Sequence, residues 1–143
     1  MLERVPFEKG EWKPHPKSMS LERLATHVAE IPHWLTDAIT TDELDFAKGF
    51  VKNKVADKEQ LLKLFDDSAS RAMEELKKVS DETFLEKWSL RNGDHIYFTM
   101  PKIIVARNLA MNHLYHHRAQ LSVYLRLLDV PVPGMYGPSA DDK

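Results

Sequence analysis

The positions of the prolines constrain this chain more than any other feature of its sequence. Of the eight prolines, three lie within the first 16 residues and three lie after residue 130, so only Pro32 and Pro101 interrupt the middle of the chain. Because proline breaks the interior of a helix, long proline-free stretches are where long helices can form. Glycine is also scarce, at 5 of 143 residues. This distribution predicts an all-α protein.

Length and composition predict one globular domain over residues 1–143 and exclude several classes of function. The formal net charge of −2 excludes a strongly basic nucleic-acid binder, so no nucleic-acid partner is expected. The longest aliphatic run, Ile103–Ala106, is too short to cross a membrane. The first residues carry no signal-peptide pattern, so we expect a cytoplasmic protein. The absence of cysteine removes disulfides, thiolate metal sites and a cysteine nucleophile.

Hydrophobic spacing predicts two helices in the first half of the chain. The first begins after a capping Ser18 or Ser20, and its apolar residues recur at three- and four-residue steps as far as Leu35. Pro32 is expected to kink or break it. Residues 40–57 are polar and are predicted to be a connection. The second helix is expected to begin at Asp57, with a charged, solvated outer face.

The second half of the chain predicts a β-hairpin followed by a long helix. Residues 87–100 contain two β-prone runs around Asn92-Gly93, a pair typical of a type I′ turn. Pro101 is expected to occupy the first turn of the last helix, which can reach Asp129 with an irregularity near Asn112. The tail, residues 130–143, is rich in proline and glycine and is not expected to be helical.

Histidines are the residues most capable of chemistry in this chain. His113 and His117 are four residues apart on the last helix, so both imidazoles lie on one face and can share a metal ion. His27 occupies an equivalent apolar face of the first helix. If the two helices pack together, three imidazoles converge, and three nitrogen ligands with an open position are typical of a catalytic metal site. Imidazole ligands accept Zn, Ni, Cu or Fe(II) alike.

Simpler interpretations of the histidines stay open. A histidine on an apolar face is often a core residue with one hydrogen-bond partner. His116 points about 100° away from His117 and is assigned to a supporting, interface or core role. His15, His33 and His95 are expected in a loop, on the off-face of the first helix and in the hairpin, and are not expected to bind metal.

Other catalytic patterns are absent from the sequence. It contains no G-x-S-x-G, P-loop, glycine-rich dinucleotide fingerprint or H-E-x-x-H motif. Arg118 and Gln120 flank the histidine pair and are candidates for binding a substrate carboxylate or a thiol-cofactor anion, although a surface role is equally compatible. No residue stands out as a general base.

Two stretches carry a family resemblance that extends over nearly the whole chain. Residues 112–126, NHLYHHRAQLSVYLR, and the following VPGMYGPSAD of residues 132–141 resemble the signature helix and tail of the DinB-like (DNA-damage-inducible) family. Upstream, residues 24–32, LATHVAEIP, resemble the family's first metal-ligand stretch. The segment before it, with WKPH and KSMS, fits the family's lead into that stretch.

The resemblance implies an up-down-down-up four-helix bundle with a divalent metal, nickel or zinc, held by His27, His113 and His117. Relatives include thiol-dependent S-transferases, a thiol-dependent isomerase and metal-dependent hydrolases. It therefore implies a metal-dependent enzyme of S-transferase or hydrolase type that acts on a small molecule, with a low-molecular-weight thiol as co-substrate in the transferase case. The alternatives are a non-catalytic metal-binding stress protein and a helical interaction module whose histidines belong to the core.

The sequence departs from the family pattern at two places. Ala119 stands where members usually have glycine, which can narrow the packing beside the histidine pair. The chain begins where the family's first helix is expected to end, so either that helix is truncated or the bundle is completed in another way. Three amphipathic helices without a fourth leave apolar surface open, and a homodimer is therefore expected.

Overall fold

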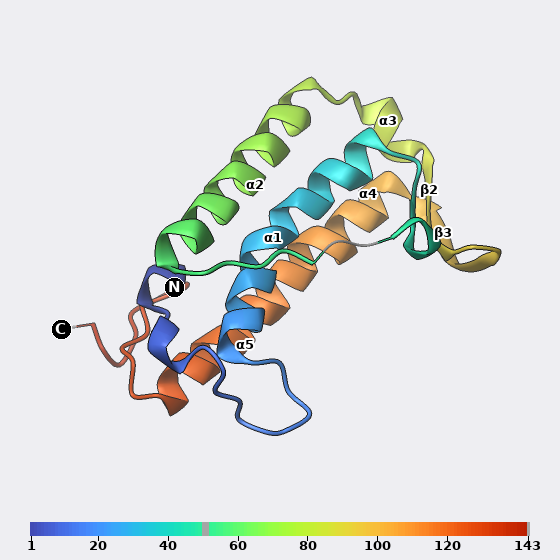
Figure 1. Cartoon of the computed structure of the whole chain (residues 1–143). Helices are drawn as coiled ribbons and strands as arrows, with labels where there is room; N and C mark the ends of the chain where they lie inside the picture. The colour runs from blue at the N-terminus through green and yellow to red at the C-terminus, as the bar shows by residue number, and fades with distance from the viewer. Residues whose placement is uncertain (50–51, 143) are drawn as a thin grey trace.

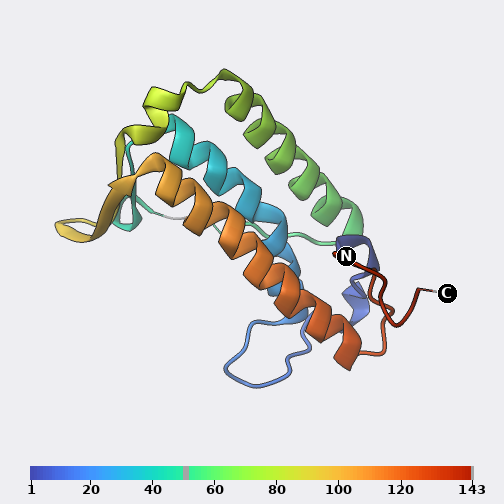
Figure 2. The same cartoon turned by 180° about the vertical axis from the view of Figure 1, so that it is seen from behind.

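The computed structural model describes residues 1–49 and 52–142; Phe50, Val51 and Lys143 lie outside the described residues. Within these ranges, three long helical segments lie side by side, with α1 between the other two (Figures 1 and 2). Short 3-10 turns, η1 (Leu2–Arg4) and η2 (Phe7–Lys9), precede α1. Both ends of the described chain lie at one end of the helices, where Arg4 Nη1 donates to the Pro131 carbonyl at 2.9 Å.

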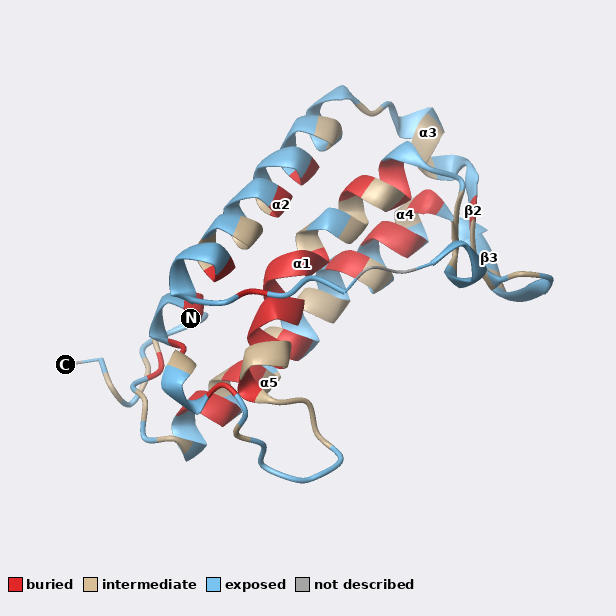
Figure 3. Cartoon of the chain, in the orientation of Figure 1, coloured by how far each residue is buried: buried red, intermediate tan, exposed pale blue. Residues whose placement is uncertain are grey.

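Helix α1 (Leu21–Thr40) is the central element of the fold. Its N-cap is Ser20, whose Oγ accepts a hydrogen bond from the Arg23 backbone N–H at 3.2 Å. The helix continues through Pro32, so the local break expected there is not seen. Figure 3 shows that much of α1 is buried, as expected for a helix packed on both sides.

Helix α2 (Lys58–Lys78) runs along one side of α1, parallel to it (Figure 1). Asp57 is its N-cap, as the sequence indicates, and accepts from the Gln60 backbone N–H at 2.8 Å. Leu61 and Ala72 face the core, whereas the outward face is exposed (Figure 3) and includes the ion pair of Lys63 with Asp67. The short helix α3 (Asp81–Leu85), capped by Ser80, follows and was not predicted.

A three-stranded sheet closes one end of the helices. The predicted hairpin is present as β2 (Lys87–Asn92) and β3 (His95–Pro101), paired antiparallel. Asn92 pairs with His95, so the two turn residues are Gly93 and Asp94 rather than Asn92 and Gly93. Gly93 has φ +59° and Asp94 has a negative φ, which fits a type II′ rather than a type I′ turn.

The predicted connection over residues 40–57 contains regular structure that corrects the sequence interpretation. Strand β1 (Glu43–Asp45) adds to β2 in parallel, and η3 (Phe46–Lys48) follows it. Trp88 on β2 is almost fully buried against Ala38 and Val105, and its indole N–H donates to Thr41 Oγ1 at 3.0 Å. The sheet is therefore packed onto α1 and the start of the last helix through a small core of its own.

The last helical segment contains the irregularity expected near Asn112. It begins with α4 (Lys102–Val105), since Pro101 still pairs in β3 and serves as the N-cap. A π-helical segment, η4 (Ala106–Asn112), separates α4 from α5 (His113–Leu127). π-Turns inside α-helices often lie at functional sites. Here the π-helix ends immediately before His113.

The structure is mostly helical and contains the predicted hairpin, but the all-α prediction is corrected, because β1 joins the hairpin in a three-stranded sheet. The described residues of the tail contain no helix. The four-helix, up-down-down-up arrangement stays a prediction. The main core lies between α1, α2 and α5 and includes Leu24, Val28, Leu61 and Leu121.

The homodimer also stays a prediction, and one surface feature accords with it. Large apolar side chains on the last helix recur at exposed positions, namely Met111, Tyr115, Val123 and Leu127. Association that covers this face would remove apolar surface from water. We expect size-exclusion chromatography with light scattering to give twice the 16.5 kDa chain mass. A stable monomer at micromolar concentration would contradict this expectation.

Candidate metal centre

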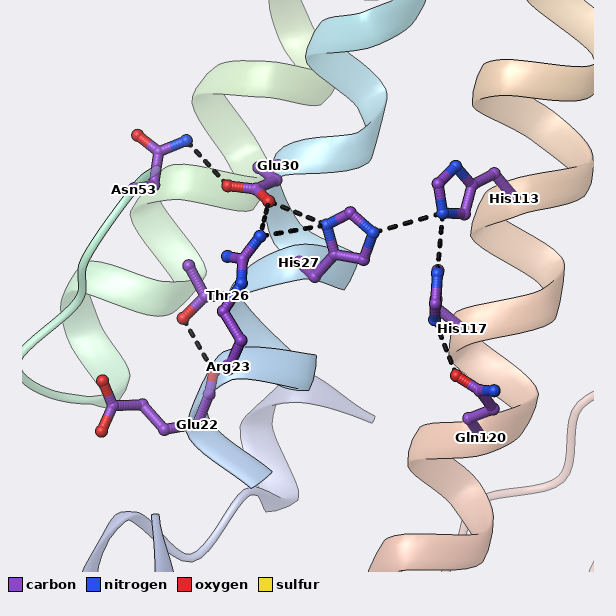
Figure 4. Close-up of polar contacts among 9 residues, drawn as sticks. All are labelled: Glu22, Arg23, Thr26, His27, Glu30, Asn53, His113, His117 and Gln120. Carbon is purple, nitrogen blue, oxygen red and sulfur yellow. Dashed lines mark hydrogen bonds and ion pairs between the residues drawn. The ribbon is translucent and has the colours of Figure 1, made fainter. Parts of the chain in front are cut away.

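The three histidines predicted from the sequence converge between α1 and α5 (Figure 4). His27 Nε2 lies 3.2 Å from His113 Nε2, and His117 Nε2 lies 2.7 Å from the same atom. Their candidate ligand nitrogens all lie within 4.8 Å of one another. His27 and His117 are buried and His113 is half-buried. Helical spacing places His113 and His117 on one face, and the packing of α1 against α5 brings His27 opposite them.

Each ring is oriented by a partner at its other nitrogen. His27 Nδ1 lies 2.8 Å from Glu30 Oε1, and His117 Nδ1 lies 2.7 Å from Gln120 Oε1. His113 hydrogen-bonds to the backbone of Leu109, in the π-helical segment. With these oxygens as acceptors, the proton of each neutral ring sits on Nδ1 and the Nε2 lone pairs face one another. Metal-binding histidines usually have this kind of outer partner.

The arrangement fits a metal ion in its distances and in its chemistry. Two imidazole nitrogens bound to one tetrahedral zinc at about 2.0–2.1 Å lie about 3.3 Å apart. The 3.2 Å between the Nε2 atoms of His27 and His113 matches this geometry. The 2.7 Å between the Nε2 atoms of His113 and His117 is shorter, so these two rings must move slightly apart to bind one ion. Facing lone pairs at such distances repel, and a shared cation removes that repulsion. The three nitrogens therefore form a candidate site for a divalent metal.

Glu30 is the centre of the hydrogen-bond network behind His27 (Figure 4). Its carboxylate accepts from Arg23 Nη2 at 2.7 Å and from Asn53 Nδ2 at 3.0 Å, as well as from His27. Burial by itself would raise the pKa of Glu30, but the hydrogen bonds from His27, Arg23 and Asn53 outweigh it and lower the pKa to about 2. Glu30 is thus an anion at neutral pH, which compensates part of the charge of a cation beside His27.

Two of the histidines are held in the neutral form that metal binding requires. Burial, followed by the proximity of His117 and His27, lowers the pKa of His113 to about 4. Burial also lowers the pKa of His117, although the hydrogen bond to Gln120 opposes this. Protons therefore compete less with a metal at these rings than at a free imidazole.

These shifts predict that acid destabilises the metal-free protein. Between pH 6.5 and about 4, His113 is protonated in the unfolded chain but neutral in the folded chain. The free energy of unfolding therefore falls as the pH falls. Glu30 adds a loss of the same sign between pH 4.5 and about 2. Chemical unfolding in chelator-containing buffers from pH 7.5 to 4 measures this trend. Stability that is constant or rises on acidification would contradict it.

Metal occupancy should also fall on acidification, because imidazole must be neutral to bind a metal ion. With an unperturbed imidazole pKa of about 6.5, we expect the loss as the pH drops through about 6 to 4.5.

A cavity of about 340 Å³ adjoins the histidine cluster. His27 and His113 form part of its wall, and five apolar side chains form most of the remainder: Trp34, Leu44, Phe46, Leu90 and Leu109. The Trp34 ring meets the rings of His27 and His113 edge-on, with centroids 5.3 and 4.9 Å apart. A molecule in this cavity therefore lies against two of the three candidate ligands.

The other histidines lie outside the cluster, in agreement with the sequence interpretation. His116 is exposed, with its ring 4.8 Å from that of His117. His15 is in an exposed loop, His33 pairs with Asp37 on the outer side of α1, and His95 is in the hairpin beside Tyr97.

The two polar residues that flank the histidine pair have different positions. Gln120 orients His117. The Arg118 guanidinium instead lies against the Tyr115 and Tyr136 rings, with centroids 5.3 and 5.1 Å away, outside the cavity. The structure thus gives Arg118 no contact with the candidate metal centre.

Sequence reasoning missed Glu30, Arg23 and Asn53. One signal was available, because Glu30 follows His27 by three residues and Gln120 follows His117 by the same spacing. Residues three apart on a helix are neighbours, so a histidine followed at this spacing by an oxygen-bearing side chain is a supported ligand pattern. Asn53 had no such signal, since it reaches Glu30 only after the chain has returned along α1.

Replacing Glu30 with glutamine tests the supporting network. The amide keeps the size of the side chain but removes the anion that His27 and Arg23 share, and we expect a 10- to 100-fold loss of zinc affinity. Competition with a chromogenic chelator measures it. Glu82→Gln, on α3 and away from the site, is the control and should leave affinity unchanged. Equal affinities for the wild type and Glu30→Gln would show that the network does not support the ligand.

Together, the fold and the site define a helical protein with a three-histidine candidate metal centre. The DinB family model matches residues 1–143, and the chain belongs to the DinB family. No curated protein matches the chain. Within the part of the chain that the structure describes, no helix is long and apolar enough to cross a membrane.

Solved structures of DinB-like proteins share the fold. One from Bacillus subtilis has 20% sequence identity and a TM-score of 0.73, with 96% of this chain and 88% of that chain covered. Another, from Bacillus cereus, has 23% identity and a TM-score of 0.69, with 95% and 86% covered. At these identities the likeness concerns the fold alone.

Proposed function

We propose that this protein is a divalent-metal-dependent enzyme that acts on a small molecule, of thiol S-transferase or hydrolase type. The observation that carries the proposal is the convergence of His27, His113 and His117 beside an apolar cavity. Three imidazole ligands leave coordination positions open for substrate, the pattern of catalytic rather than structural zinc sites. The cavity volume of about 340 Å³ is within the range of small-molecule sites.

The roles of the chain's own residues follow from their contacts. His27, His113 and His117 would hold the metal. The resemblance to the DinB-like family implies that this metal is nickel or zinc. A metal in such a site lowers the pKa of a bound water or thiol and polarises an electrophile. Glu30 and Gln120 keep the rings in position, and Trp34 packs against two of them. The apolar wall excludes water from a ligand that lies next to the histidines.

The two reaction types are separated by the co-substrate that turnover requires. Metal-loaded protein purified without a histidine tag is assayed with a low-molecular-weight thiol plus alkylating electrophiles, and separately with ester and amide substrates. Turnover that depends on the metal and disappears in His113→Ala supports the proposal; a requirement for thiol identifies the transferase.

Two results would overturn the proposal. Stoichiometric metal without turnover in either panel would indicate the non-catalytic metal-binding alternative. Absence of stoichiometric metal would indicate that the histidines are core residues of a helical interaction protein.

A further inference from the structure

The inner surface of the cavity beside the histidines is almost entirely apolar. Among the described residues that line it, five have side chains made mostly of carbon: Trp34, Leu44, Phe46, Leu90 and Leu109. The two lining histidines use their nitrogens elsewhere. His27 Nδ1 contacts Glu30, and the Nε2 atoms of His27 and His113 face one another. A ligand in this cavity therefore meets almost no protein group with which it can form a hydrogen bond.

Arg23 also lines the cavity, but its charge does not face a ligand there. Its Nη2 donates to Glu30 at 2.7 Å, and its Nη1 is buried. Figure 4 shows the guanidinium directed toward Glu30 and His27. The positive charge is thus paired with the Glu30 carboxylate. Within the part of the chain that the structure describes, the cavity wall therefore provides no free charge that could pair with an ionic ligand.

The size of the cavity and the position of Trp34 define the group that fits. A cavity of about 150 Å³ holds benzene, so the volume of about 340 Å³ accommodates an aromatic ring with a short substituent. The Trp34 ring lies edge-on to the rings of His27 and His113, with centroids 5.3 and 4.9 Å apart. A ring packed on Trp34 therefore lies next to the candidate metal ligands.

The sheet contributes much of this wall. Leu44 on β1 pairs in register with Leu90 on β2, and Phe46 follows in η3. Trp34 on α1 and Leu109 in the π-helical segment provide the remaining apolar side chains. Because the wall comes from both the sheet and the helices, its shape can be changed from β2 without substituting a residue next to a candidate metal ligand.

We propose that the substrate of this site carries an uncharged, apolar group about the size of one aromatic ring, which this cavity binds, and that the cavity selects against a charge of either sign on that group. An ion loses its hydration on entering such a cavity, and this wall provides neither a free charge nor hydrogen bonds in exchange. The inference deepens the proposed function and rests on it for the reaction, whereas recognition of the group can be measured without metal.

Three probes of nearly the same shape but different charge test this selection. Nitrobenzene is neutral, benzoate is an anion and benzamidinium is a cation. Each is titrated into the metal-free 143-residue chain and its binding is followed by ligand-observed NMR. Metal is omitted because it can itself bind benzoate. We expect nitrobenzene to bind at least tenfold more tightly than either ion, because the ions lose far more favourable hydration on entering the cavity.

Cavity-filling variants show whether nitrobenzene binds at this site. Leu90→Phe places a larger side chain in the wall and should weaken nitrobenzene binding at least tenfold while zinc stoichiometry is retained. Leu85→Phe makes the same change at a residue that is 73% exposed and outside the cavity, so it should leave the affinity unchanged. If Leu90→Phe does not fold, Leu109→Phe fills the cavity from the π-helical segment and provides the same comparison.

Three outcomes would overturn the inference: binding of benzoate or benzamidinium as tight as that of nitrobenzene, no binding of nitrobenzene to the wild type, or undiminished nitrobenzene affinity in the folded cavity-filling variant. Zinc stoichiometry in separate zinc-loaded samples reports on the proposed function. A chain that shows the expected selectivity but binds no zinc would contradict the metal site alone.

Discussion

Replacing His117 with alanine is expected to abolish stoichiometric metal binding. His117 contributes one of three nitrogens that lie within 4.8 Å of one another, and two imidazoles with only water added form a much weaker site. The loss of affinity should exceed the 10- to 100-fold expected for an outer partner such as Glu30. Zinc titration against a chromogenic chelator measures the affinity and the stoichiometry together.

The same variant should lose the stabilisation that metal gives to the folded state. A ligand at 100 times its Kd adds about 2.7 kcal/mol to the free energy of unfolding, so the wild type should melt higher with zinc than with chelator. His117→Ala should melt at the same temperature in both buffers. His116→Ala is the control, since His116 is adjacent in sequence but exposed. A zinc-dependent Tm in His117→Ala that equals that of the wild type would exclude this histidine as a ligand.

The second large effect is expected far from the metal centre, in the core beneath the sheet. Trp88→Ala removes an indole that is 1% exposed and leaves Thr41 without its hydrogen-bond donor. Truncation of a buried tryptophan costs about 3–5 kcal/mol, and for a domain of this size Tm should fall by about 10 °C or more. Chemical and thermal unfolding measure the change.

A control variant at an exposed residue nearby in the sequence tests whether the loss of stability comes from the burial of Trp88. Leu85 precedes β2 and is 73% exposed, so Leu85→Ala should change stability by less than about 0.5 kcal/mol. A loss below about 1 kcal/mol in Trp88→Ala would show that the sheet is a peripheral attachment rather than part of the cooperative fold.

The helical part of the fold could be predicted because its signals are local. The proline-free stretches, the capping residues Ser20 and Asp57 and the three- and four-residue apolar spacing all concern neighbours in sequence. Strand β1 could not be predicted in this way. Its pairing to β2 joins Leu44 to Leu90, 46 positions apart, and three residues carry no periodic pattern of their own.

The hairpin turn shows how a local signal can be displaced by one residue. Asn92-Gly93 predicts a type I′ turn, but the register of β2 and β3 keeps Asn92 in the strand and makes Gly93 the first turn residue. Asp45 Oδ1 accepts from the Gly93 N–H at 2.9 Å, so a contact from β1 accompanies the shifted turn. Strand β1, which the sequence did not predict, therefore also contacts the turn.

In the candidate site, too, residues with a local sequence signal could be predicted, whereas residues brought together by tertiary packing could not. Helical spacing identified His113 and His117 directly, and His27 followed from its position on an equivalent face. The residues that support them arise from packing. Asn53 reaches Glu30 across 23 positions of sequence, and Trp34, Leu90 and Leu109 meet in one cavity only when the sheet packs against the helices.

The most direct test of the account is a crystal structure of the zinc-loaded protein, purified without a histidine tag, with anomalous diffraction data at the zinc edge. We expect one zinc ion per chain, within about 2.0–2.1 Å of the Nε2 atoms of His27, His113 and His117. Zinc bound elsewhere, or no anomalous peak between these three rings at saturating zinc, would contradict it.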